Sequence, residues 1–170
     1  VTYYAEWVLG VNRSASQPYI VSDYEHNSGA LLARNAYNSE FGGRVAFLAA
    51  SKAPHGLTAD RNEFLGRMGN LSHPAALSRI GLASTVGTGL DPCAAIQLHI
   101  DLPVGGSEEI FFLLGQGENH QQTLQLIQSY QDSAQVDAAW QAVNTFWDQI
   151  LGTVSVQTPD TAMNILLNRW

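Results

Sequence analysis

The sequence predicts an antiparallel β-sandwich followed by linker helices, so that a β region gives way to an α region along 170 residues. Up to Gly117, short apolar runs of strand length are separated by Gly, Asn and Pro, which favours an antiparallel sandwich over a parallel sheet. After Gly117 the apolar residues recur at helical spacing. Apolar residues make up 45% of the chain, which suffices for one sizeable core.

The β region divides into predicted strands at its turn residues. Residues 3–9 alternate like a strand that is covered on at least one face. Residues 19–24 and 30–36 flank Asn27-Ser28-Gly29, a turn signal, and form a predicted hairpin. Residues 44–50 follow Gly42-Gly43 and form another strand. Residues 94–102 and 109–114 flank a segment with two glycines, which predicts a second hairpin.

Three helices are predicted after Gly117. Asn119 is the expected N-cap of the first, which runs to about residue 131. In the second, apolar residues recur at spacings of four, three, four and three, and Gly152 ends the helix. We interpret this stripe as a packing surface rather than a ligand platform; it consists of Val136, Trp140, Val143, Trp147 and Ile150. The third helix begins at Thr158 as cap, with Pro159 at its first position.

Composition excludes several classes of function. The net charge of −7, with Lys52 as the only lysine, argues against a nucleic-acid partner. No apolar run approaches the roughly 20 residues of a membrane span, so no membrane contact is expected of this segment. Cys93, the single cysteine, has an apolar setting and indicates a small buried hydrophobe in a reducing, cytoplasmic compartment.

The densest group of charged residues lies at residues 60–67, Asp-Arg-Asn-Glu-Phe-Leu-Gly-Arg, in a chain with only 14% charged residues. The structural interpretation is an ion-pair network, Asp60–Arg67 or Glu63–Arg61, that fixes a loop. The functional interpretation is a loop that faces a polyol or a phosphate, because guanidinium groups pair with carboxylates, phosphates and hydroxyls.

No other motif in the sequence indicates a catalytic, metal-binding or nucleotide-binding site. The five histidines show no close metal-ligand pattern, and Cys93 lacks the setting of a catalytic nucleophile. Gly115-Gln116-Gly117 lacks the residues of a nucleotide loop, and we interpret it as a hinge between strand and helix. We therefore expect no metal and no cofactor.

The order of short motifs resembles the inverting glycoside phosphorylases of glycoside hydrolase family 94 (formerly glycosyltransferase family 36), and most closely the phosphorylase-type region of cyclic β-1,2-glucan synthases. The resemblance spans nearly the whole chain. It is carried by residues 4–9 (YAEWVL), 29–35 (GALLARN), 60–67, 90–95 (LDPCAA), 112–117 (FLLGQG), Trp147 with Leu151-Gly152, Thr158-Pro159-Asp160 and 166–170 (LLNRW).

The resemblance implies a β-sandwich, a helical linker and an (α/α)6 barrel that holds the chemistry. Residues 1–117 would be part of the sandwich (a partial supersandwich), residues 118–157 the linker, and residues 158–170 the first helix of a truncated barrel. The family's general acid would lie beyond residue 170, so no carboxylate here is assigned a catalytic role.

The full-length enzyme would use inorganic phosphate as co-substrate to cleave or rebuild a β-glucosidic bond. It would be cytoplasmic, or the cytoplasmic part of an inner-membrane enzyme. Its partners would be a β-glucan oligosaccharide and the barrel of the same polypeptide.

The same resemblance implies a binding site for the sugar acceptor. The loop matching residues 60–67 would reach the barrel mouth, with Arg61 and Arg67 as sugar contacts. Asp60 and Glu63 would accept hydrogen bonds from sugar hydroxyls or orient the guanidiniums, and Phe64 would anchor the loop.

Two alternative functions stay open on the sequence alone. A stand-alone carbohydrate-binding sandwich would need exposed aromatic residues, and burial of Trp7, Tyr3 and Tyr4 would remove that platform. A docking module would expose an apolar patch along its last two helices. We also expect self-association, because unpaired strand edges recruit other chains.

Overall fold

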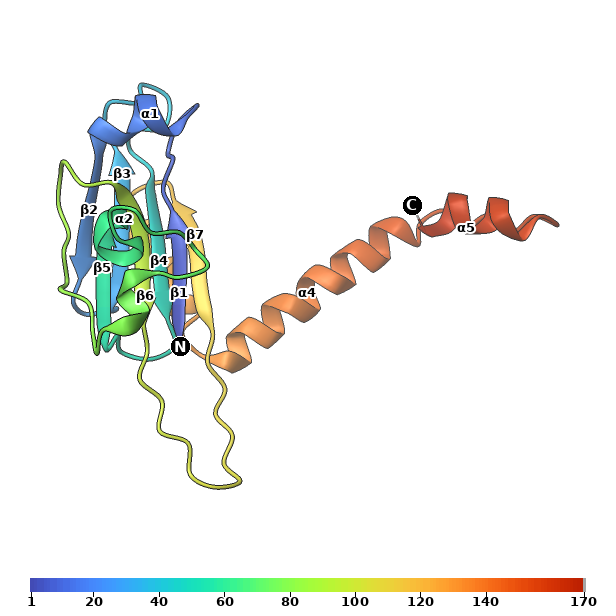
Figure 1. Ribbon diagram of the computed structural model, residues 1–170. Helices are drawn as coiled ribbons and strands as arrows, with labels where there is room; N and C mark the ends of the chain where they lie inside the picture. The colour runs from blue at the N-terminus through green and yellow to red at the C-terminus, as the bar shows by residue number, and fades with distance from the viewer. Residues whose placement is uncertain (170) are drawn as a thin grey trace. The chain divides into compact units, whose positions relative to one another are not determined.

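The computed structural model describes residues 1–169 and divides into two compact units, Val1–Gln131 and Asp132–Trp170 (Figure 1). The first unit is a sandwich of two antiparallel sheets, as the sequence predicted. The second unit contains two helices. Trp170, which the sequence analysis assigned to the last helix, lies outside the described residues.

The two sheets contain three and four strands. The smaller sheet has the order β1-β6-β5, formed by β1 (Thr2–Glu6), β6 (Pro92–Gln97) and β5 (Gly56–Asp60). The larger has the order β2-β3-β4-β7, formed by β2 (Ile20–Glu25), β3 (Ala30–Asn35), β4 (Val45–Ala50) and β7 (Phe112–Gly117). The predicted hairpin of β2 and β3 is confirmed, with Ile20 opposite Asn35.

The main core lies between the sheets and covers one face of β4, a strand that is buried along its whole length. Its inward side chains, Leu48 among them, pack with Leu31 and Ile96. Its alternate side chains, including Phe47, face the other way and pack with Ile127 of α3 (His120–Ser129). Because both faces of β4 are covered, its sequence is a continuous apolar run rather than an alternating one.

The prediction of a second hairpin is wrong. β6 and β7 belong to different sheets, because β6 pairs with β1 on one side and β5 on the other, whereas β7 pairs with β4. Residues 98–111 cross between the sheets as a long loop, which Figure 1 shows extending beyond the strand ends. Strand β5 was missed, since its five residues, GLTAD, begin with glycine and include two polar residues.

The first strand also differs from its prediction. It ends at Glu6 rather than at Leu9, which has a left-handed backbone with φ 40°. Short helical turns follow this strand and the later β5, namely α1 (Arg13–Ser16), η1 (Gln17–Tyr19), α2 (Arg61–Leu65) and η2 (Ala75–Ser78).

The helices after Gly117 follow the sequence with one correction. Asn119 caps α3 by accepting a bond from the Gln122 amide, and α4 (Ser133–Leu151) ends at Gly152, as predicted. The predicted start of the last helix is wrong. α5 spans Thr161–Arg169, and Asp160 rather than Thr158 accepts from a first-turn amide, at 2.9 Å. Thr158 instead bonds the side chain of Asn164.

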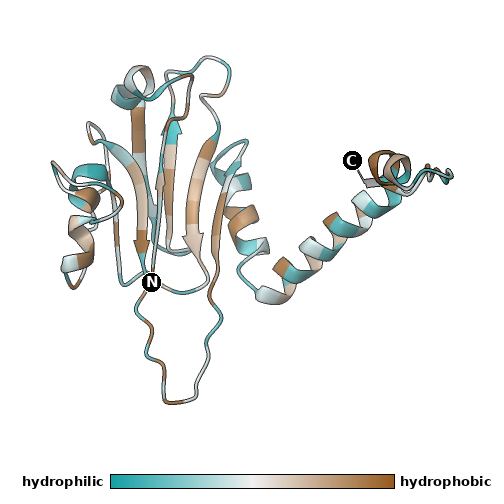
Figure 2. Cartoon of the chain, turned by 45° about the vertical axis from the view of Figure 1, so that its right-hand side comes forward, coloured by the Kyte–Doolittle hydropathy of each residue, from teal (hydrophilic) through white to brown (hydrophobic). Residues whose placement is uncertain are grey.

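The apolar stripe of α4 is exposed, with Trp140 67% and Trp147 52% accessible to solvent. Figure 2 shows hydrophobic segments recurring along this helix. No helix in the described part of the chain is both long enough and apolar enough to cross a membrane. The divisions expected at residues 117/118 and 157/158 stay predictions, although α3 falls within the first compact unit.

Candidate functional site

The segment of residues 60–67 is a capped helical turn on the smaller sheet. Asp60 ends β5 and caps α2, its Oδ1 accepting from the Asn62 amide at 3.0 Å. The Arg61 amide donates to the Asp91 carbonyl at 2.8 Å, and Gly66 ends the turn with φ 89°. Glycine suits this backbone conformation, which side chains disfavour. The local sequence therefore specifies a rigid turn rather than an open loop.

Phe64 fixes this turn to the sheet. Its side chain is 3% exposed and stacks on the ring of Tyr4, with the ring centroids 4.6 Å apart. The neighbouring Leu65 is also buried, and both belong to a small core with Ala76 and Ala95. The anchoring role expected of Phe64 fits this burial.

Arg61 belongs to a network of two guanidiniums and two carboxylates. Its Nε donates to Oε1 of Glu6 at 2.9 Å, and its Nη1 lies 3.6 Å from Asp91. Arg13 bonds the other Glu6 oxygen at 2.6 Å and also pairs with Asp91. The two pairs considered from sequence, Asp60–Arg67 and Glu63–Arg61, do not occur among residues 1–169.

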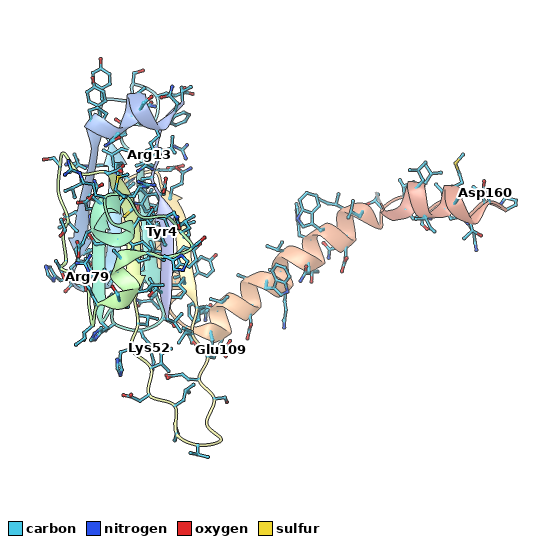
Figure 3. All side chains as sticks on the ribbon, viewed as in Figure 1. Tyr4, Arg13, Lys52, Arg79, Glu109 and Asp160 are labelled. Atoms are coloured by element: carbon cyan, nitrogen blue, oxygen red, sulfur yellow. The ribbon has the colours of Figure 1, made fainter. Side chains whose placement is uncertain are left out.

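Sequence reasoning missed Glu6, Arg13 and Asp91 as members of the network that contains Arg61. They come from β1, from α1 and from the segment that precedes β6, and no local spacing connects them. Figure 3 labels Arg13 and Tyr4 on this part of the sandwich. Each of these residues is charged and could therefore have been suspected of belonging to an ion-pair network. Their positions in the sequence do not show that they meet, because it is the pairing of β1 with β6 that brings the charges together.

The bond between Glu6 and Arg61 favours the charged form of both groups. Burial by itself would raise the pKa of Glu6, but hydrogen bonds from Tyr4 and Arg61 outweigh this and hold that pKa below its ordinary value. The bond to Glu6 raises the pKa of Arg61. Burial, then the bond to Glu6, raises the pKa of the Tyr4 hydroxyl. At neutral pH the carboxylate is ionised and Tyr4 is neutral, so neither is poised for proton transfer.

Glu63 is used to hold a neighbouring loop. Its two carboxylate oxygens accept from the Thr58 hydroxyl and from the Ala83 amide, both at 2.6 Å. These bonds lower the pKa of Glu63 although burial opposes them. Arg79, labelled in Figure 3, donates to the Glu63 carbonyl at 2.5 Å. Glu63 therefore fastens residues 79–85 to α2.

Arg67 differs from the other three predicted site residues. It lies in the exposed turn after Gly66. Its side chain makes no hydrogen bond or ion pair with the rest of residues 1–169. Asp60, Arg61 and Glu63 thus hold the turn together, while Arg67 presents an uncompensated guanidinium to solvent.

Other candidate groups for chemistry are buried or dispersed. Cys93 is fully buried, and burial raises the pKa of its thiol, which opposes formation of the nucleophilic thiolate. Within residues 1–169 no three His, Cys, Asp or Glu side chains form a group that could hold a metal ion.

The aromatic residues near the N-terminus do not form a flat binding platform. Trp7 is 7% exposed and belongs to the main core. Tyr3 packs against Phe112, with ring centroids 5.1 Å apart, and Tyr4 lies on Phe64. The carbohydrate-binding alternative, as formulated from these three residues, therefore loses its platform.

Comparison with known proteins finds sequence similarity to a glucan synthase and to two phosphorylases. Cyclic beta-(1,2)-glucan synthase NdvB of Rhizobium meliloti (strain 1021) is 36% identical over 168 residues, which is 98% of this chain and 6% of that protein. N,N'-diacetylchitobiose phosphorylases of Vibrio proteolyticus and Vibrio furnissii are each 25% identical, over 79% and 98% of this chain. The chain spans 16% and 21% of those two proteins.

The family model for the glycosyl hydrolase 94 supersandwich domain matches residues 1–133. This range contains both sheets, the 60–67 segment and α3. The resemblance stated from the sequence motifs is therefore confirmed, and the chain belongs to the glycosyl hydrolase 94 supersandwich family.

Proposed function

We propose that this chain is the non-catalytic sandwich and linker region of a β-glucan-active glycoside phosphorylase or glycosyltransferase that makes or processes cyclic β-1,2-glucan. The observation that carries the proposal is the 36% identity to a cyclic β-1,2-glucan synthase along 98% of the chain. Similarity to two phosphorylases supports the reaction type. Inorganic phosphate would be the co-substrate of the full-length enzyme, in the cytoplasm or on the cytoplasmic side of an inner membrane.

The 60–67 segment would contribute to the binding of the sugar acceptor. Arg67 is exposed, and a guanidinium donates several hydrogen bonds to hydroxyl oxygens. Arg61 is already bonded to Glu6, and Glu63 to Thr58 and Ala83. Direct sugar contact therefore falls to Arg67, whereas Asp60, Arg61 and Glu63 position the turn that carries it.

The second unit would join the sandwich to the catalytic barrel of the same polypeptide. Four apolar side chains of α4 lie at helical spacing and are 48–67% exposed, namely Trp140, Val143, Trp147 and Ile150. In α5, Ile165 and Leu166 are 56% and 57% exposed. Large exposed apolar surfaces of this kind mark interaction sites.

The decisive experiment compares chain 1–170 with the full-length enzyme. Each is incubated with a β-1,2-gluco-oligosaccharide and phosphate, and glucose 1-phosphate is measured. We expect release by the full-length enzyme and none above a buffer blank by the chain alone. Release by the chain alone, or no release by the full-length enzyme, overturns the proposal.

A further inference from the structure

A cavity opens at the end of the sandwich where β3 ends and β4 begins. Its volume is about 470 Å³, within the range of small-molecule sites. The lining comes mainly from the segment after β1, the end of β3, the loop before β4 and the end of β7; the residues used below are Leu9, Asn35, Glu40, Phe41, Arg44 and Gln116. None of them belongs to the 60–67 segment or its charge network.

The floor of this cavity is formed by polar residues on the inner face of the four-stranded sheet. Asn35 lies on the same face of β3 as Leu31 and Ala33, which belong to the core between the sheets. Gln116 lies opposite Ala46, also a core residue, and therefore shares its face. A three-stranded sheet does not cover all of a four-stranded one, and Gln116 is exposed on the uncovered part.

The walls are held in place by hydrogen bonds within the sandwich. Asn35 is 9% exposed and donates through Nδ2 to the Leu9 carbonyl at 2.9 Å, which fixes the segment after β1 above the floor. Leu9 has φ 40°, an unusual value for a residue with a side chain. Asn38 accepts from the amides of Glu40 and Phe41 at 3.0 and 2.8 Å, which shapes the loop before β4. The cavity is therefore preformed.

The side chains on the rim offer one aromatic face and both signs of charge. The Arg44 guanidinium lies 5.4 Å from the centroid of the Phe41 ring. Neither Arg44 nor Glu40 has an ion-pair partner in the described part of the chain. The Arg44 guanidinium provides hydrogen-bond donors, the Glu40 carboxylate provides acceptors, and the Gln116 amide provides both. Such a set suits a neutral molecule with many hydroxyls and an apolar face, because the opposite charges of Arg44 and Glu40 leave no net charge that would favour an ion of either sign.

The geometry points to this cavity as a second saccharide-binding site, on the sandwich itself and separate from the 60–67 segment. Phe41 covers the apolar face of a sugar ring, while Arg44, Glu40 and Gln116 bond its hydroxyls. The choice of a β-1,2-glucan as the saccharide rests on the proposed function. The cavity would hold a short stretch of the glucan without taking part in its cleavage.

Titration of chain 1–170 with the β-1,2-linked glucose disaccharide, followed by calorimetry or by NMR shifts, tests this site. We expect saturable binding that weakens at least about tenfold in Arg44→Ala and in Phe41→Ala. Arg34→Ala is the matched control, because Arg34 is exposed on the opposite face of β3. It should bind like the unchanged chain, and circular dichroism should show all variants folded.

Three results would overturn the second site. They are no saturable binding, binding that Arg44→Ala and Phe41→Ala leave unchanged, and binding of inorganic phosphate without binding of the disaccharide. The outcome is independent of the proposed function, because disaccharide binding needs no phosphorolysis. Glucose 1-phosphate release by the full-length enzyme would persist if the cavity bound nothing.

Discussion

The ring of Tyr4 in β1 stacks on the ring of Phe64 in α2, with centroids 4.6 Å apart and planes inclined by 11°. The Tyr4 hydroxyl donates to Oε1 of Glu6 at 2.8 Å, and Arg61 donates to the same oxygen at 2.9 Å. One carboxylate oxygen therefore connects the aromatic stack to the charge network. This connection fixes the turn that carries Arg67.

Removal of the Phe64 ring should lower the stability of the folded chain. We expect Phe64→Ala to lower the free energy of unfolding by about 3–5 kcal/mol, because it leaves a cavity beneath α2. Urea denaturation measures this. Phe41→Ala is the control, since Phe41 is 48% exposed and its loss should cost about 0.5 kcal/mol or less. Equal losses in the two variants would contradict the anchoring role of Phe64.

Glu63→Gln should also destabilise the chain, although it keeps the size of the side chain. The amide has one acceptor oxygen instead of two, so either the buried Thr58 hydroxyl or the Ala83 amide loses its partner. We expect a loss of about 1–3 kcal/mol by urea denaturation. The exposed Glu109 makes Glu109→Gln the matched control. A Glu63→Gln variant as stable as Glu109→Gln would show that these bonds contribute nothing.

Stability should fall as the pH is lowered below the ordinary Glu pKa of 4.5. The pKa values of Glu6, Glu25 and Glu63 all lie below that value in the folded chain, and for Glu25 the cause is hydrogen bonds from Ser28 and Asn27 to its carboxylate. The folded state then binds fewer protons than the unfolded state in this window, so stability rises with pH there and is lost on acidification. Melting temperatures measured from neutral pH downward should show this fall. A melting temperature that holds or rises as the pH passes below 4.5 would contradict the prediction.

The apolar stripe of α4 should drive self-association of chain 1–170. We expect dimers or larger assemblies by light scattering at moderate concentration, because Trp140 and Trp147 are exposed. The double variant Trp140→Glu with Trp147→Glu should be monomeric. Gln141→Glu adds a charge to the same helix outside the stripe and should still associate. A monomer mass for the unchanged chain at all concentrations would refute the prediction.

The features that were predicted correctly from the sequence are those that depend on a few neighbouring residues. The turn at residues 27–29, the Asn119 cap and the stop at Gly152 each act within a few residues, and the structure confirms all three. The predicted start of α5 was wrong because two residues, Thr158 and Asp160, can each cap this helix. Asp160 is the one that accepts from the first-turn amide, whereas Thr158 bonds Asn164.

Long-range pairing could not be predicted from one sequence. β6 lies between β1 and β5, which are far from it in the chain, and no turn signal records that choice. The same holds for the site: the 60–67 segment was recognisable by its charge, but the partners of Arg61 come together only through the fold of the sheet. The cavity at the end of β3 was not foreseen, because its polar residues become visible as a group only on the inner face.

The kinetics and stability of Arg67→Ala in the full-length enzyme test the central claim most directly. We expect the KM for the acceptor to rise at least tenfold, about 1.4 kcal/mol, with the melting temperature unchanged, because Arg67 bonds nothing else in the described chain. Arg61→Ala is the matched control and should lower the melting temperature by breaking the bonds to Glu6 and Asp91. A lower melting temperature for Arg67→Ala with an unaltered KM would contradict the account.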